Sequence, residues 1–228
     1  MKPHPARQIG YYPGYSTLAQ QAFWDAATRR VVLRRIEPPP PLRFFGPSEA
    51  SRMQAVCDRI LPQDDRPLDY RIPIVPYIDQ RLAEGIGAGY RYADMPPDGD
   101  AHRLGLRAVD EIALHLFTRE FLRLANRERD QVLLTLHDAQ PPAALAIFRQ
   151  MSVQHYWSLL VTDVVQVYYA HPWAWDEIGF GGPAYPRGYM RLERGEAEPW
   201  ERPEQRYEWC APADSLSGTC TPLPESQP

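Results

Sequence analysis

The stretch AHRLGLRAVDEIALHLF, residues 101–117, decides the fold class more clearly than any other part of the chain. Its apolar residues recur every three or four positions, which places them on one face of an α-helix. Glu111 and His115 point to the opposite side, since each residue turns the helix by about 100°. The stretch is therefore predicted to be an amphipathic helix. Its apolar face consists of Leu106, Val109, Ala113, Leu116 and Phe117.

Similar helical patterns lie on both sides of this stretch, and no window shows the sustained alternation of a half-buried strand. Ser16–Arg35 lacks Gly and Pro and is predicted to be one helix with Ser16 as its N-cap. The last long helical stretch carries apolar stripes on two sides, so we divide it at Ser152, which can cap the second piece. We therefore predict an all-α fold, an irregular helical bundle with long loops rich in Pro, Gly and aromatic residues. The remaining helices are predicted from Gly46-Pro47 to the stop at Pro62, from about Pro73 to Glu84, and from near Asn126.

Composition divides the chain further. It has 228 residues, 25 of them proline, so long segments must lie outside helix interiors and central strands. We expect an N-terminal extension (1–15), a helical body (16–170) and an extended tail rich in aromatic residues and proline (171–228). The formal net charge of −4 argues against nucleic-acid binding. No apolar run is long enough for a membrane-spanning helix, and no signal peptide is visible after Met1.

Motifs for catalysis, cofactor binding or metal binding are not visible. The six histidines fall in no metal-binding motif, and Glu111 and His115 lack a second pair of ligands at similar spacing. The run Gly85–Gly89 follows a predicted helix rather than a strand, so a flexible loop is a better interpretation than a phosphate-binding loop. We therefore predict no catalytic, cofactor-binding or metal-binding residue in this chain.

The tail is the best candidate for a functional surface. A disordered, solvating tail would hold few large aromatic residues, yet four of the six tryptophans lie here. Large aromatic side chains act as anchors at protein interfaces, and proline lowers the cost of ordering a docking segment. The alternative is that these aromatic residues fold back on the helical body and complete its core. The predicted partner-binding residues are Trp173, Trp175, Phe180, Tyr185, Tyr189, Trp200 and Trp209.

The three cysteines suggest different roles. Cys57 falls within a helical apolar pattern and is predicted to be buried. Cys210 and Cys220 bracket a short polar loop, and a disulfide or two separate thiols are both compatible with this spacing.

Several motifs carry a family resemblance. They are Phe44-Phe45, CDRILP (57–62), VPYIDQRL (75–82), FLRL (121–124), RERD (127–130), YYAHP (168–172), WDEIGFGGP (175–183) and PRGY (186–189). Over roughly Phe44 to Tyr189 the chain resembles subunit 3, the small subunit, of the gluconate 2-dehydrogenase family. The closing glycine-rich and aromatic stretch is the most specific part of the resemblance.

The resemblance implies an accessory role. In that family the small subunit carries no cofactor, and the FAD sits in a large partner of the glucose-methanol-choline (GMC) oxidoreductase class. A multihaem cytochrome c is often a third subunit, and the small subunit is needed to assemble and export its partner. These features imply a non-catalytic subunit that binds a GMC-type flavoprotein and does not itself insert into a membrane. The alternative is a free-standing all-α enzyme that depends on a metal or cofactor.

The cellular location stays open. Many members of the family carry a twin-arginine signal, and none is visible after Met1. The resemblance implies a periplasmic protein if the chain is exported with its partner, and a cytoplasmic one otherwise.

Overall fold

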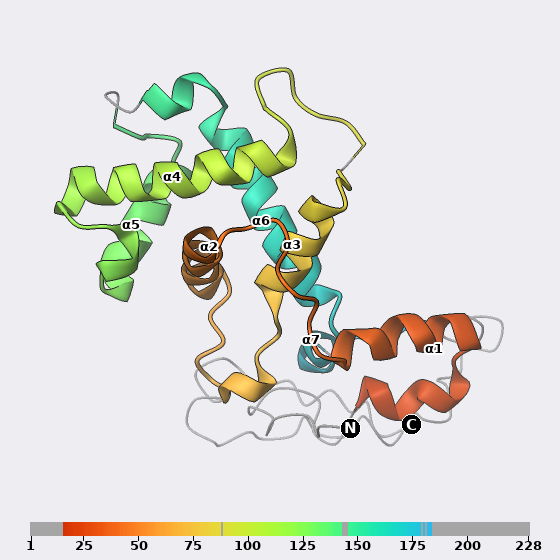
Figure 1. Cartoon of the computed structure of the whole chain (residues 1–228). Coiled ribbons are helices and arrows are strands. Elements are labelled where there is room, and N and C mark those ends of the chain that lie inside the picture. The colour runs from red at the N-terminus through yellow and green to blue at the C-terminus, as the bar shows by residue number, and fades with distance from the viewer. Residues whose placement is uncertain (1–15, 88, 143–145, 179, 181, 184–228) are drawn as a thin grey trace, which may run out of the picture. The chain divides into compact units, whose positions relative to one another are not determined.

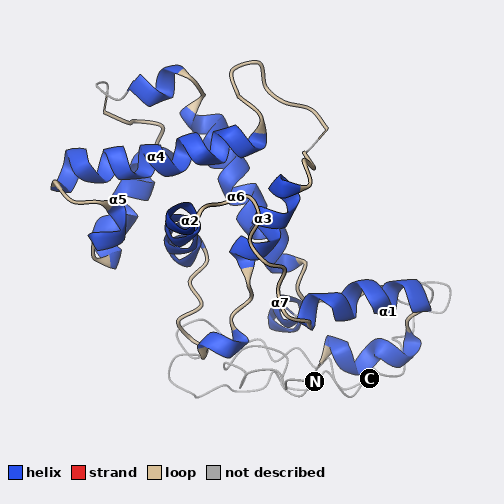
Figure 2. Ribbon diagram, in the orientation of Figure 1, coloured by secondary structure: helices blue, strands red, loops and turns tan. Residues whose placement is uncertain are grey.

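The structure is a computed structural model that describes residues 16–87, 89–142, 146–178, 180, 182 and 183. Every regular element in these residues is a helix, which confirms the all-α prediction (Figure 2). The chain forms two compact units. Residues 39–168 make up one, here called the helical core, and residues 1–38 with 169–228 make up the other, here called the terminal unit. The expected helical body (16–170) is therefore divided, because its first helices group with the C-terminal part of the chain.

Among its described residues the helical core contains five α-helices, which appear in Figure 1 in colours from brown to cyan. Helix α2 begins where predicted, with Pro47 in its first turn and Glu49 accepting a hydrogen bond from the Gly46 N–H (2.9 Å). The predicted division at Ser152 is also confirmed, since its hydroxyl accepts the His155 N–H at the start of α6. The α-helices are α2 (Pro47–Ile60), α3 (Ile74–Ala83), α4 (Asp98–Phe117), α5 (Asn126–His137) and α6 (Val153–Tyr169), with short 3-10 helices η3 (Leu68–Tyr70), η4 (Phe121–Arg123) and η5 (Ala146–Arg149).

Helix α4 packs against α2, α5 and α6. Leu106, Val109 and Ala113 are buried as predicted, but Leu116 is 45% exposed and Phe117 is only half-buried. The last turn of α4 therefore extends beyond the core that its middle turns fill. Gly105 lets α6 approach closely, because the Tyr156 ring fills the space that a Cβ would occupy.

A buried carboxylate fixes the segment that leads into α2. Asp79 on α3 is fully buried and accepts hydrogen bonds from the backbone N–H groups of Arg43, Phe44 and Phe45 (2.6–3.0 Å). These three residues follow the polyproline segment Pro38–Pro41, where the two units also meet in sequence. Three aligned backbone N–H groups thus stabilise the Asp79 carboxylate through charge-assisted hydrogen bonds.

The terminal unit differs from the prediction at its start. The expected single helix Ser16–Arg35 is broken at Trp24, and Ser16 makes no capping hydrogen bond. Instead, Asp25 caps the second helix by accepting the Thr28 N–H (2.8 Å), and the hydrogen bonds from Thr28 lower the pKa of Asp25. Trp24 turns inward and is 3% exposed, so tertiary packing overrides the local helical preference. The elements are η1 (Thr17–Phe23), α1 (Ala26–Leu33) and η2 (Arg34–Ile36).

The tail also differs from the prediction at its beginning. Residues Pro172–Ile178 form helix α7, whereas an extended segment is expected from residue 171. Helix α7 lies beside η1, so the two ends of the described chain share one unit (Figure 1). The apolar centre of the terminal unit consists of Leu18, Trp24 and Val32, with Leu33, Ile36 and Trp175 packed around them.

Candidate functional site

Three of the predicted partner-binding residues lie in or next to α7. Trp173 is 6% exposed and so presents almost no surface in the isolated chain. Trp175 and Phe180 are half-buried, and their rings meet edge to face with centroids 5.5 Å apart. The Trp175 indole N–H also donates to the Tyr169 carbonyl (2.5 Å). These three side chains therefore pack within the terminal unit itself.

The remaining predicted residues belong to the last part of the chain. Tyr185, Tyr189, Trp200 and Trp209, and the two cysteines Cys210 and Cys220, lie outside the described residues. Their roles in partner binding and in a disulfide stay predictions.

The two ends of the described chain are held together by direct contacts. The Thr17 N–H donates to Asp176 Oδ1 (2.6 Å), and the Thr17 hydroxyl donates to the Phe180 carbonyl (3.3 Å). A Cβ on Gly182 would lie 2.6 Å from the Thr17 methyl carbon, and Gly182 has a φ of +81° that favours glycine. Thr17 is thus packed closely against Asp176, Phe180 and Gly182.

A polar cluster inside the helical core resembles catalytic machinery in its residue types. Arg81 on α3 donates to Asp98 on α4 (2.7 Å) and to Asp163 on α6, and His102 Nε2 lies 2.8 Å from the same Asp163 carboxylate. Burial by itself lowers the pKa of Arg81, but the hydrogen bonds and charges of Asp98 and Asp163 outweigh it and raise that pKa. Arg81 therefore stays positive and pairs with two carboxylates.

The burial of this cluster favours a structural role. His102 has no exposed surface, so no substrate atom can come within the roughly 2.6–3.2 Å that proton transfer needs. His102 lies on the buried side of helix α4. In this arrangement Arg81, His102 and Asp163 tie α3, α4 and α6 together.

The other described histidines lie in separate environments. His155 pairs with Asp94 (2.9 Å), His171 accepts the Trp173 N–H (3.2 Å), and His115 is exposed. No group of three or more His, Cys, Asp or Glu side chains in the described ranges is placed to hold a metal ion.

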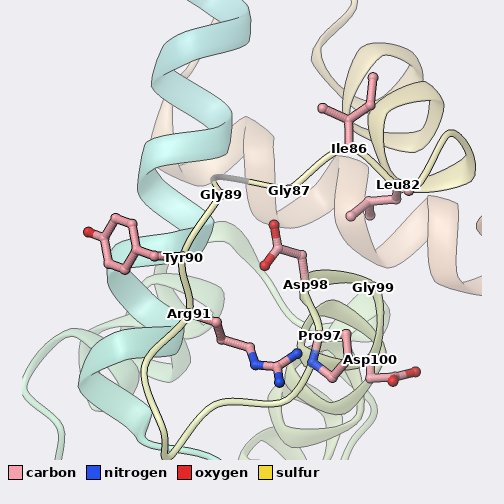
Figure 3. Close-up of a pocket in the computed structure, with 11 residues that line it drawn as sticks. Leu82, Ile86, Gly87, Gly89, Tyr90, Arg91, Pro97, Asp98, Gly99 and Asp100 are labelled. Atoms are coloured by element: carbon pink, nitrogen blue, oxygen red, sulfur yellow. The ribbon is translucent and has the colours of Figure 1, made fainter.

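A surface cavity of about 630 Å³ lies between the glycine-rich run 85–89 and the first turn of α4 (Figure 3). The Arg91 side chain reaches across it, and Tyr90 points away from it. Asp98 and Asp100 also line the cavity but point in different directions, so they do not form the converging carboxylate pair of a hydrolytic site. Because the glycine-rich run follows helix α3 and not a strand, the cavity also lacks the structural context of a dinucleotide-binding loop.

The loop beside this cavity is held to the start of α6. Tyr92 stacks on the His155 ring with centroids 3.8 Å apart and planes 4° from parallel. The Asp94 carboxylate binds His155 Nδ1, and its carbonyl accepts the Ser152 N–H (3.1 Å). These contacts, here called the His155 clasp, hold the loop to the first turn of α6.

The comparison with known families rests on more than half of the chain. A family model described as gluconate 2-dehydrogenase subunit 3 matches residues 47–182. The chain belongs to the gluconate 2-dehydrogenase subunit 3 family. The match covers the described helices from α2 to α7 and confirms the resemblance seen in the sequence motifs. No curated protein and no solved structure is significantly similar to this subunit 3 family member.

The family name also identifies the chain as a subunit of a gluconate 2-dehydrogenase-type complex. Among the described residues, no helix is both long and apolar enough to span a bilayer.

Sequence reasoning missed the polar cluster and the His155 clasp. Their members lie far apart in the chain, since Arg81 and Asp163 are 82 residues apart and Asp94 and His155 are 61 apart. One signal was present, namely Asp163 within the apolar stripe of the last long helix. A lone acid in such a stripe requires a buried cationic or hydrogen-bonding partner.

Proposed function

We propose that the chain is a non-catalytic accessory subunit that binds and stabilises a large FAD-containing dehydrogenase subunit of the GMC class. The observation that carries this proposal is the family match over residues 47–182. In this role the chain assists assembly of the complex and its export. The electrons that the flavoprotein takes from its substrate pass to a multihaem cytochrome c where the complex contains one. FAD belongs to the partner, and the chain's own cavity has no dinucleotide-binding loop to hold it.

The described core supports this proposal through the chemistry of its polar groups. The histidine that sits in an acid–base arrangement, His102, is fully buried, and Asp163 beside it is already shared with Arg81. These groups are used to hold three helices together. A rigid helical scaffold of this kind suits a subunit whose task is to present a binding surface.

Co-expression with the flavoprotein subunit tests the proposal. We expect the two chains to elute as one complex, and the large subunit to lose yield or flavin when this chain is omitted. The purified chain alone should oxidise no sugar or alcohol with an artificial electron acceptor. A purified chain that carries a stoichiometric metal or chromophore and oxidises a substrate by itself would establish the alternative, a free-standing enzyme.

A further inference from the structure

Two surface cavities adjoin in the helical core. The first, of about 630 Å³, lies beside the first turn of α4, and the second, of about 160 Å³, lies beside α6. Tyr90 and Arg91 line both cavities, so the loop that carries them runs between the two. Figure 3 shows the Arg91 side chain reaching across the first cavity and Tyr90 pointing away from it. The two cavities together are here called the Arg91 groove.

Arg91 brings a positive charge to the first cavity. Its guanidinium has no hydrogen-bond or ion-pair partner among the described residues. Of the two acids that line this cavity, Asp98 is already paired with Arg81 (2.7 Å), and Asp100 points away from Arg91 in Figure 3. A guanidinium can bind a carboxylate through two parallel hydrogen bonds. The first cavity therefore complements an acidic side chain of a partner.

Exposed apolar and aromatic side chains surround the same groove. Ile86 is 55% exposed at the first cavity, and Tyr92 is 50% exposed at the second. Tyr90, which lines both, is 74% exposed. Single exposed apolar residues are normal on a protein surface, but these three gather around one pair of cavities. Tyrosine and arginine are also enriched in protein interfaces, so the groove has the composition of a binding surface.

The loop that carries these side chains is held in place without a partner. The His155 clasp ties it to α6 at Tyr92 and Asp94. Met95 is buried, and its N–H donates to the Tyr92 carbonyl (3.1 Å). Tyr90 and Arg91 directly precede these anchored residues, so docking on them costs little additional ordering of the backbone.

We propose that the Arg91 groove binds an extended segment of the large flavoprotein subunit in which an acidic residue lies next to an apolar one. The acidic side chain pairs with Arg91 in the first cavity. The apolar side chain packs on Tyr90 and on Leu159, which line the second cavity. This inference rests on the proposed function and names a contact surface in the helical core, in addition to the predicted aromatic tail.

The experiment measures binding of the full chain to the purified flavoprotein subunit and compares Arg91→Glu with a matched control, Arg107→Glu. Arg107 lies on α4 in the same unit, is also exposed, and has no partner among the described residues, but it lines neither cavity. Arg91→Glu places a negative charge opposite the acidic side chain of the partner, so we expect its Kd to exceed that of Arg107→Glu by about fivefold or more. A smaller ratio would overturn the groove as the binding site.

A second readout identifies the occupant and does not depend on the folding of Arg91→Glu. A photo-crosslinker in place of Tyr90, in the otherwise intact chain, should form a bond to the flavoprotein subunit in the assembled complex. The crosslinked peptide should contain Asp or Glu next to an apolar residue. Crosslinks only within the chain, only to a second copy of it, or to a peptide without an acidic residue would overturn the proposal.

The outcomes separate the two proposals. If the intact chain does not bind the flavoprotein, the proposed function fails and the groove has no partner of this kind. If the intact chain binds, and Arg91→Glu binds as tightly as Arg107→Glu, the accessory function stands and the Arg91 groove is not its contact surface.

Discussion

Replacement of Gly105 by alanine tests most directly how α4 and α6 pack. Gly105 lies in the buried middle of α4, and a Cβ there would lie 1.8 Å from Tyr156 Cζ and 2.1 Å from its hydroxyl oxygen. Carbon atoms in contact lie about 3.5–4.0 Å apart, so the overlap cannot be absorbed by small shifts. Either the two helices separate or the Tyr156 ring leaves its site.

Two opposing effects set the magnitude. Alanine is more favourable than glycine in a helix interior by about 1 kcal/mol. Expelling a fully buried aromatic ring costs about 3–5 kcal/mol, as large core truncations do. The clash therefore outweighs the helix preference, and the free energy of unfolding should fall by about 2–4 kcal/mol. For a chain of this size, this corresponds to a melting temperature about 5–15 °C lower.

Thermal unfolding followed by far-ultraviolet circular dichroism measures the effect. Gly99→Ala is the matched control, since Gly99 lies on the same helix and its Cβ would meet only the edge of the Phe44 ring, at 2.8 Å. That ring can give way, and we expect a change of about 1 kcal/mol or less. A Gly105→Ala chain that melts within about 2 °C of the parent would refute the close packing of Tyr156 on α4.

Three further substitutions give distinct expectations. Tyr156→Phe should leave the free energy of unfolding in urea unchanged or raise it by up to about 1 kcal/mol. The reason is that the buried hydroxyl has no hydrogen-bond partner among the described residues. A clear fall in that free energy would reveal a partner. Burial raises the pKa of the Cys57 thiol, so above about pH 8.5 the unfolded chain releases this proton and the folded chain does not. Stability should then fall as pH rises, and Cys57→Ala should reduce the slope between pH 9 and 10 by about 1 kcal/mol per pH unit. An unchanged slope would show that the folded thiol ionises. Asp94→Asn should lower the free energy of unfolding by less than about 1 kcal/mol, because both side chains of the Asp94–His155 pair are partly exposed. We expect faster amide hydrogen exchange confined to the loop around Tyr92. Unaltered exchange in this loop would contradict the His155 clasp.

Local signals in the sequence were enough to place most of the helical core. Pro47 and Glu49 mark the start of α2, and Ser152 divides the last long helical stretch where two apolar stripes diverge. These signals act within one helical turn, so their effect depends little on contacts with the rest of the chain. The start of the chain behaves differently, because burial of Trp24 breaks a segment that local preference favours as one helix, and Asp25 becomes the cap.

Features that depend on distant contacts could not be predicted. A helical pattern indicates which side of α4 is apolar but not how far its neighbours extend, so the exposure of Leu116 was not foreseen. The pairing of Arg81 with Asp163 joins different helices and has no local signature. The partnership of η1 with α7 depends on contacts between the two ends of the chain.

The family match begins at residue 47, whereas the described fold begins at residue 16. The segment before α2 stabilises buried groups within the matched range. Asp79 and Asp176 are both buried carboxylates within the matched range 47–182. Asp79 accepts three backbone N–H groups from residues 43–45, and Asp176 accepts the Thr17 N–H, so these donors lie outside the match. A buried carboxylate deprived of its donors costs about 3–5 kcal/mol, a large part of the stability of an ordinary domain. The backbone N–H groups of residues before position 47 therefore stabilise two buried carboxylates of the matched range in this chain.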